Sequence, residues 1–233
     1  MVISYKNKFI FFHIPKCAGS AIRDALLTVP ETQSDPSAQH IKPVQMDMRL
    51  KKEGHDMDTF YKFAFVRNPW ARTVSGYYFT LKCVKCYHDP DPKFDRYRLY
   101  PWLKPTAEEG YIHREYSAED DYWIKQVHLD VTDPIINFRK HIRKMGNIGI
   151  PEVDKNPYTG WISQCNFNYI GRVENIQNDL NKICENIGIT PVTVPHSNVT
   201  EHNHYTEYYD DETREIITSF NKKDIEYCGY KFG

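Results

Sequence analysis

The sequence predicts an α/β protein of three layers, with a central parallel sheet flanked by helices, in one domain over residues 1–233. Two observations predict this fold. Short apolar runs of strand length recur along the chain, and each is followed by a loop that leads into a segment with helical spacing. Such strand–loop–helix units form parallel sheets covered by helices. The hydrophobic fraction of 40% is ordinary for a globular protein, so a packed core is expected.

The first two units lie in the N-terminal third of the chain. Phe9–Phe12 is an apolar run that predicts a buried strand, and residues 20–27 have helical spacing after a short turn. Residues 63–66 predict a second buried strand. Asn68 and Pro69 then open a helix, because Asn is a good N-cap and Pro suits the first helical position.

The C-terminal part repeats the pattern. Residues 169–171 predict a short strand, and residues 173–187 predict a helix. Two closing helices are expected over residues 211–220 and 223–228. Residues 82–160 begin with a stretch rich in Pro, Asp, Tyr and Lys that has no clean period. This composition predicts an insertion or lid beside the sheet, where an acceptor would bind.

Charge and hydropathy argue against several kinds of partner. Thirty basic residues face 31 acidic ones, so no global field favours nucleic acid, and any anion site must be built locally. The early apolar run, residues 9–14, is too short for a signal-peptide core or a membrane span. We therefore expect a cytoplasmic protein. Its six cysteines are sparse and irregular, which favours free thiols over a disulfide framework.

The segment after the first predicted strand has the residues of an anion cradle. Small residues at positions 18–21 let the backbone close around a ligand, and the helix start offers unpaired N–H groups. Lys16, just before these small residues, adds a positive charge, and Ser20 adds a hydroxyl group. The familiar nucleotide loop with two glycines before a lysine is absent. A tight turn with an exposed lysine is the plainer interpretation.

The segment after the second predicted strand carries a second cationic turn. Arg67 stands at the carboxyl end of that strand, where open α/β sheets bind ligands. Its guanidinium can bind a phosphate through two parallel N–H···O hydrogen bonds. Ser75 follows two helical turns later and can add a hydroxyl. Arg72, in the same segment, could also contact a ligand, but a structural ion pair is the favoured interpretation because arginines commonly form such pairs. Two such sites on neighbouring strands imply a ligand with two separated anionic groups.

These segments resemble the PAPS-dependent sulfotransferases, whose donor is adenosine 3′-phosphate 5′-phosphosulfate (PAPS). Residues 14–20 resemble the 5′-phosphosulfate loop of that family, and residues 66–69 with Ser75 resemble its 3′-phosphate motif. Residues 171–175 and 224–232 are also similar to its soluble members. The likeness is to the carbohydrate and heparan branch, and it implies a P-loop nucleotide-kinase-like fold in a soluble, microbial-type member. Residues 87–160 match nothing in that pattern.

The resemblance implies roles for individual residues. Lys16 would contact the oxygen that bridges the 5′-phosphate and the sulfuryl group. Arg67 and Ser75 would hold the 3′-phosphate. Backbone N–H groups of five residues would hold the 5′-phosphate: Cys17, Ala18, Gly19, Ser20 and Ala21. The family also has a late basic loop, which matches residues 195–205. Here that loop carries histidines where lysine or arginine is expected: His196, His202 and His204.

The reaction implied is in-line transfer of a sulfuryl group to an acceptor hydroxyl, which needs a base. Carbohydrate sulfotransferases of this branch place a catalytic histidine between the first helix and the second strand, which favours His40. A histidine suits this role because its pKa lies near neutrality. His13 and His55 are weaker candidates, and an acidic residue of the insertion could also serve. A sulfuryl group carries less charge than a phosphoryl group, so no metal is expected.

Three other patterns have a functional and a plainer interpretation. Cys83, Cys86 and His88 have a spacing that is found among zinc ligands. A structural zinc site needs four ligands and no second pair of cysteines follows, so ordinary cysteines of the lid are favoured. The basic run at residues 139–144 could bind an acidic glycan, although a solvated helix face is commoner. Three aromatic residues could stack on sugar rings, although packing is the simpler role: Tyr100, Trp102 and Trp123.

Two alternatives to a sulfotransferase stay open at this point. A nucleoside-phosphate kinase would use a similar sheet, and it predicts magnesium dependence and ATP turnover. A non-catalytic protein that binds a nucleotide or a glycan predicts binding without transfer. For the favoured function, the acceptor is a carbohydrate hydroxyl by resemblance, with a lipid or a small metabolite as alternatives. The oligomeric state is open.

Overall fold

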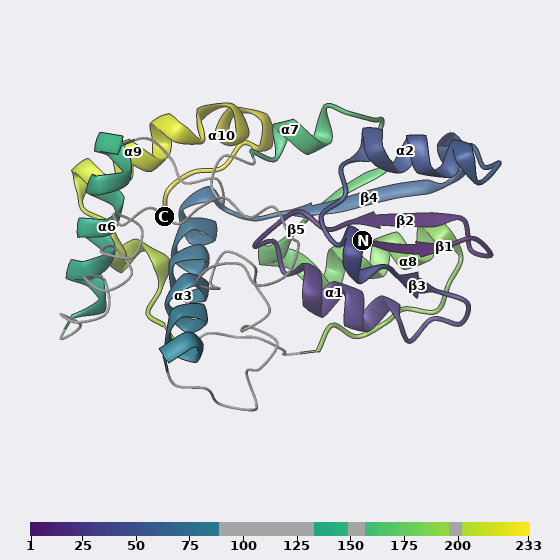
Figure 1. Ribbon diagram of the computed structural model, residues 1–233, viewed down its shortest axis with the longest axis horizontal. Coiled ribbons are helices and arrows are strands. Elements are labelled where there is room, and N and C mark those ends of the chain that lie inside the picture. Colours follow the sequence, from purple (N-terminus) through teal and green to yellow (C-terminus); the bar gives the residue numbers. More distant parts are fainter. Residues whose placement is uncertain (89–132, 149–156, 196–201) are drawn as a thin grey trace, which may run out of the picture.

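A five-stranded sheet forms the centre of the protein (Figure 1). The structure, a computed structural model, describes residues 1–88, 133–148, 157–195 and 202–233. Strands β2, β4 and β5 are parallel neighbours, and β1 pairs antiparallel with both β2 and β3. The spatial order is β3 (Gln33–Ser34), β1 (Val2–Ser4), β2 (Phe9–Phe12), β4 (Tyr61–Val66) and β5 (Tyr169–Arg172).

The predicted parallel sheet is therefore wrong in one respect, because the sheet is mixed. The three predicted strands are confirmed and form its parallel part. The antiparallel strand β1 was missed because it is only three residues long and lies in a polar stretch. Hairpin pairing places Val2 opposite Phe11 and Ile3 opposite Ile10, which buries both apolar side chains of β1.

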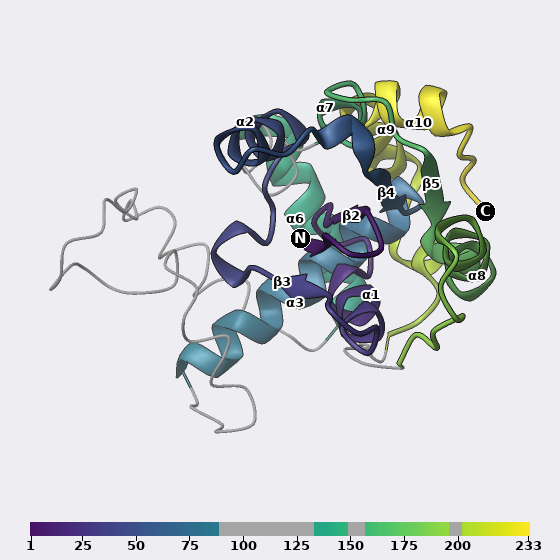
Figure 2. The same cartoon turned by 90° about the vertical axis from the view of Figure 1, so that its right-hand side faces the viewer.

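Helices cover both faces of the sheet, as predicted. Figure 2 shows α2 and α7 on one side of the sheet and α1 and α8 on the other. Four helices accompany the sheet: α1 (Gly19–Leu26), α2 (Pro43–Lys52), α7 (Thr159–Ile162) and α8 (Ile176–Ile187). Four more gather towards the carboxyl ends of β2 and β4: α3 (Pro69–His88), α6 (Pro134–Ile148), α9 (Asp211–Phe220) and α10 (Lys222–Cys228). Short 3-10 turns complete the described fold: η1 (Pro36–Ala38), η2 (Met57–Thr59), η5 (Val173–Asn175) and η6 (Tyr205–Tyr208).

The core is divided between the two faces by the alternation of the strands. Phe9 and Phe11 of β2 pack in a cluster with side chains of α1 and α8, whereas Ile10 and Phe12 pack with side chains of α2 and α3. Successive side chains of a strand point to opposite faces, so one short apolar strand supports two helix layers. The three-layer arrangement predicted from the sequence is confirmed.

The predicted insertion around residues 82–160 is only partly described. Helix α3 runs on to His88, and α6 packs Phe138 and Ile142 into the core. Residues 89–132 and 149–156 lie outside the described part of the chain, so an acceptor-binding insertion stays a prediction. In the described ranges no helix is both long and apolar enough to span a membrane. The cysteines with described side chains are free thiols: Cys17, Cys165, Cys184 and Cys228.

Candidate functional site

The two cationic turns lie side by side at one edge of the sheet. Strands β2 and β4 are adjacent and parallel, with Phe12 opposite Ala64, so both chains leave the sheet in the same direction (Figure 1). Neighbouring strands are about 4.8 Å apart. The β2–α1 loop and the β4–α3 turn therefore start next to each other. Had the strands ended at opposite edges, no single ligand could have reached both turns.

The β2–α1 loop adopts an unusual backbone conformation. Lys16 and Ala18 have φ values of 64° and 56°, in the left-handed region, although neither is glycine. Each such residue costs about 1–2 kcal/mol, and strain of this kind gathers at ligand sites. Ala18 occupies the N-cap position of α1 and has no side chain that could cap it. The first N–H groups of α1 are therefore not used by a cap and can face an anion.

Buried contacts hold this loop against α3. Cys17 is buried, and burial raises the pKa of its thiol to about 11, so the thiol packs as a neutral group. The buried Arg72 of α3 donates from Nε to the Pro15 carbonyl at 3.1 Å. Its guanidinium carbon also lies 4.9 Å from the centroid of the Tyr158 ring. These contacts give Arg72 a structural role, while the ion pair predicted for it stays a prediction.

Asn68 caps α3 as predicted and anchors the second turn. Its Oδ1 accepts from the N–H groups of Trp70 at 3.1 Å and Ala71 at 3.3 Å. The Asn68 N–H donates to Glu174 Oε1 at 2.6 Å, and the Tyr230 hydroxyl donates to the other oxygen of Glu174 at 3.1 Å. Residues that resembled separate family motifs thus meet in one network beneath the β4–α3 turn.

Tyr158 joins the two turns, and sequence reasoning missed it. Its hydroxyl donates to the carbonyl of Arg67 and lies within hydrogen-bond reach of the Cys17 thiol. The fully buried carboxylate of Asp224 holds this segment, since it accepts from the N–H groups of Tyr158 at 2.7 Å and Thr159 at 3.0 Å. No local pattern could reveal the role of Tyr158, because its partners are 91 and 141 residues away along the chain.

Lys16 and Ser75 are brought to the same side of α3. Lys16 Nζ lies 3.9 Å from the centroid of the Phe79 ring, and Phe79 follows Ser75 by four residues. Residues four apart are neighbours on a helix surface. Ser75 is half-buried, and so is Arg67. Among the residues that the structure describes, no carboxylate forms an ion pair with Arg67. The predicted cations and hydroxyl thus lie on segments that meet where β2, β4 and α3 come together, while their convergence on one ligand stays a prediction.

His40 also lies at this edge. Its Nδ1 is 2.9 Å from the carbonyl oxygen of His13, the residue that follows β2. The centroids of the two imidazole rings are 4.6 Å apart. Desolvation lowers the pKa of His40 below its ordinary value of 6.5, and burial lowers the pKa of His13 well below that value. By contrast, His55 packs on Tyr5 and Phe60 at the amino end of β4, far along the strand from the turns.

The late histidine loop approaches α3 near Ser75. The ring of His202 stacks on Tyr78 with centroids 5.2 Å apart, and Tyr78 follows Ser75 by three residues. His204 places its Nδ1 2.7 Å from Thr206 Oγ1. His196 lies outside the described residues. The loop is thus near the predicted 3′-phosphate site, while contact with a ligand stays a prediction.

The basic run on α6 has a structural role where it is described. Arg139 donates to the carbonyl of Tyr208 at 3.0 Å, and Arg143 pairs with Asp210 at 2.5 Å and with Glu212 at 2.6 Å. These two arginines therefore join α6 to the segment that leads into α9, which is neither the glycan contact nor the solvated helix face considered from the sequence. The described side chains contain no group of metal ligands, but those of Cys83, Cys86 and His88 are not among them. Three predicted sugar-stacking residues also lie outside the described part: Tyr100, Trp102 and Trp123.

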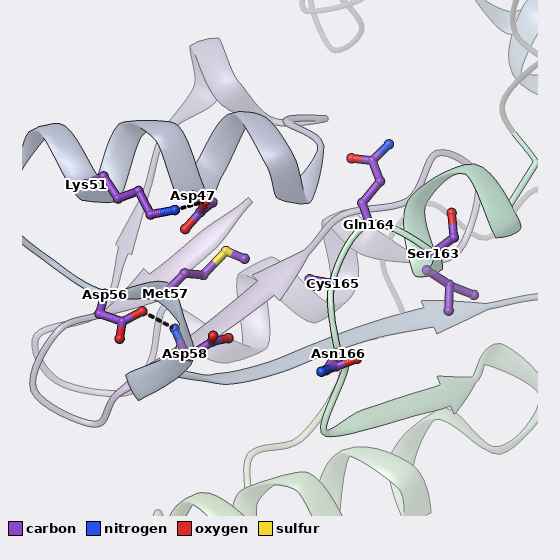
Figure 3. A pocket seen from close by; sticks show the side chains of 10 residues that line it. Asp47, Lys51, Asp56, Met57, Asp58, Ser163, Gln164, Cys165 and Asn166 are labelled. Atoms are coloured by element: carbon purple, nitrogen blue, oxygen red, sulfur yellow. Dashed lines mark hydrogen bonds and ion pairs between the residues drawn. The ribbon is translucent and has the colours of Figure 1, made fainter.

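A cavity of about 450 Å³ lies at the opposite end of the sheet (Figure 3). It is lined by residues of α2, of η2 before β4, and of the loop before β5: Asp47, Lys51, Asp56, Met57, Asp58, Ile162, Ser163, Gln164, Cys165 and Asn166. No residue predicted to bind the donor lines it. Its charges are mixed, with Lys51 Nζ 2.7 Å from Asp47.

The sheet and its two turns define a class of protein, the α/β proteins that hold anionic groups at the carboxyl ends of neighbouring parallel strands. Comparison with protein-family models narrows this class, because the model of the Sulfotransferase family matches residues 1–231. The chain belongs to the Sulfotransferase family, as the motifs suggested, and is therefore a transferase of sulfuryl groups. None of the curated proteins compared with it gives a significant match.

Proposed function

We propose that this sulfotransferase uses PAPS as its donor and a carbohydrate hydroxyl as its acceptor. The observation that carries the donor assignment is the adjacent, parallel exit of β2 and β4, each followed by a cation and a helix N-terminus. A nucleotide with a phosphate at one end and a phosphosulfate at the other matches two such turns. The family in general uses PAPS. The carbohydrate acceptor rests on the resemblance of the motifs to the carbohydrate branch.

The donor is held by both turns in this proposal. Backbone N–H groups of residues 17–21 bind the 5′-phosphate, aided by the positive end of the α1 dipole. Arg67 binds the 3′-phosphate with two N–H groups, and Ser75 donates its hydroxyl to the same phosphate. The arrangement is P-loop-like in position, although its sequence differs.

Transfer proceeds in line. The acceptor oxygen forms a bond to sulfur while the bond from sulfur to the bridging oxygen breaks, and adenosine 3′,5′-bisphosphate (PAP) leaves. Lys16 stabilises the charge that grows on the bridging oxygen, which favours the transition state over the ground state. For this, its ammonium moves from the Phe79 ring to the donor. His40 takes the proton of the acceptor hydroxyl on Nε2.

Incubation of the full chain with radiolabelled PAPS and a panel of glycans tests the proposal. Label should pass to at least one glycan, and the rate should be unchanged in EDTA because the cations of the protein replace a metal clamp. A lipid or small-metabolite acceptor that outcompetes every glycan would overturn the carbohydrate assignment. The donor assignment fails if calorimetry detects no PAP binding. Binding of PAP without transfer to any acceptor would favour the non-catalytic alternative.

A further inference from the structure

We propose that His13 is a positioning residue for the base His40. Its buried ring contacts both His40 and the start of α1, and so fixes the position of the base relative to the donor-binding loop. The inference rests on the proposed function, because it gives His40 its catalytic meaning. His13 is the first residue after β2 and is only 5% exposed. Its place between the strand and the loop lets it touch both parts of the site.

The His13 ring fills the space against the start of α1. A Cβ at Gly19 would lie 1.8 Å from Cδ2 and 2.0 Å from Nε2 of His13, so the ring rests directly on the glycine backbone. On another side the ring stacks on Phe11, with centroids 6.1 Å apart and planes 15° from parallel. Only a glycine permits this approach, and the ring in turn supports the first turn of α1.

The backbone of His13 fixes the tautomer of His40. A carbonyl oxygen can only accept a hydrogen bond, so the 2.9 Å contact requires that His40 Nδ1 carries the proton and donates it. In the neutral ring, Nε2 is then the unprotonated nitrogen, which is the state that a general base needs. The His13 ring packs against His40 at 4.6 Å and limits its rotation, so orientation and tautomer have the same origin.

Both rings are kept neutral by their surroundings. The positive end of the α1 dipole lies beside the His13 ring and disfavours its protonation. Burial lowers the pKa of His13 most, with smaller contributions from His40, the Met1 amino group, Arg23 and Lys16. Desolvation also lowers the pKa of His40 most, opposed by the bond to the His13 carbonyl and supported by the Met1 amino group and Lys16. Because His13 is neutral, it adds no electrostatic repulsion when His40 accepts a proton from the acceptor.

The first experiment measures the tautomer of His40 by nitrogen-15 NMR of the wild-type chain with labelled histidine. The expected spectrum at neutral pH shows His40 protonated on Nδ1 and unprotonated on Nε2. Protonation on Nε2, or a doubly protonated ring at neutral pH, would overturn the proposal. This readout needs neither donor nor acceptor, so it is independent of the proposed function. A chain with the expected tautomer that does not bind PAP would refute only the donor assignment.

The second experiment compares His13→Ala with His55→Ala, since His55 also packs on aromatic rings but at the other end of β4. Removal of the His13 ring should lower kcat roughly 10- to 100-fold, because small misplacements of catalytic groups have effects of this size. Water then reaches His40, and the acid limb of the kcat pH profile should move up towards 6.5. His13→Phe, which keeps a ring, should retain more of the wild-type profile if it folds.

The control separates positioning from simple destabilisation. His55→Ala should leave the acid limb of the pH profile where it is in the wild type, even if both variants lower the melting temperature. An unchanged acid limb in His13→Ala, or an equal shift in His55→Ala, would show that His13 is only a core residue. Should His13→Ala not fold, the acid limb of His13→Phe against that of His55→Ala decides the role of the ring, and the wild-type tautomer decides that of the carbonyl.

Discussion

The two ends of the sheet contrast in how they hold their charges. At the amino end, around the cavity, the lysines are paired with carboxylates: Lys51 with Asp47 at 2.7 Å and Lys62 with Asp58 at 2.9 Å. At the carboxyl end, Arg67 has no carboxylate partner among the described residues, and Lys16 lies over an aromatic ring. A cation that is already paired with a carboxylate gains less from an added anion than Arg67, for which the described residues supply no such partner.

The contrast shows that the size of a cavity does not identify the functional end of this protein. The amino end has the cavity, but Lys51 and Lys62 beside it are paired with carboxylates, and no two described helices start next to each other there. The carboxyl end has two helix N-termini and two cations that follow neighbouring strands. The predictions below test this difference, beginning with the change of largest expected effect.

Replacement of His40 should have the largest effect on transfer. His40→Ala removes the base, which lowers kcat by about 10²–10⁴-fold while PAP affinity stays near the wild-type value. In the wild type, protonation of His40 abolishes its function as a base, so the acid limb of kcat should lie below pH 6.5, in line with the lowered pKa. Stopped assays with radiolabelled PAPS across pH give both values. Unchanged transfer by His40→Ala would exclude it as the base.

Loss of Lys16 should come next. Lys16→Ala removes the cation at the leaving oxygen and should lower kcat by about 10²–10³-fold, as loss of one preorganised charge donor does elsewhere. Lys51→Ala at the amino end is the matched control, because its charge is already paired with Asp47. Equal activity losses in the two variants would mean that the two ends do not differ as proposed.

A change of Arg67 to lysine should affect binding more than chemistry. Arg67→Lys keeps the positive charge but cannot form two parallel hydrogen bonds to the phosphate. The Kd for PAP, measured by calorimetry, should therefore rise about 10- to 100-fold. Arg49→Lys serves as the control, since Arg49 binds Asp35 and Glu53 away from the site. A Kd unchanged by Arg67→Lys would contradict a bidentate contact with the 3′-phosphate.

Tyr158→Phe should separate stability from function. It removes the hydrogen bond to the Arg67 carbonyl and leaves that acceptor unpaired, at a cost of about 1–3 kcal/mol in the free energy of unfolding. The ring that packs on Arg72 remains, so the Kd for PAP should change only a few-fold. Urea unfolding with calorimetry on the same preparation measures both. An unchanged unfolding curve would show that the hydrogen bond from Tyr158 to the Arg67 carbonyl does not stabilise the two turns.

Filling the cavity should have the smallest effect. Ser163→Trp places a large ring among exposed lining residues at the amino end, and its influence on PAPS turnover should stay within about threefold, as for most surface changes. Turnover with the best glycan acceptor is the measurement. A loss that approaches that of Lys16→Ala would move the functional site to the cavity.

Local patterns were enough to predict most of the elements and the two turns. The apolar runs at β2, β4 and β5 and the Asn68 cap are encoded by neighbouring residues, so they could be read directly. Strand β1 could not be predicted in this way, because its three residues become a strand only by pairing with β2. Around the basic run only a solvated helix face was expected, and the burial of Phe138 and Ile142 in α6 was missed because it depends on α9 and η6.

By itself, the sequence determined which residues carry positive charge and which turns bend to expose backbone N–H groups. These are properties of short segments and of residue types. The sequence also predicted that the two turns follow neighbouring strands, which the pairing of β2 with β4 confirms. The tertiary structure alone decided that Tyr158 joins the turns. It also decided that the His13 carbonyl meets His40. Those facts depend on the order of strands in the sheet and on contacts between distant segments, which no local pattern contains.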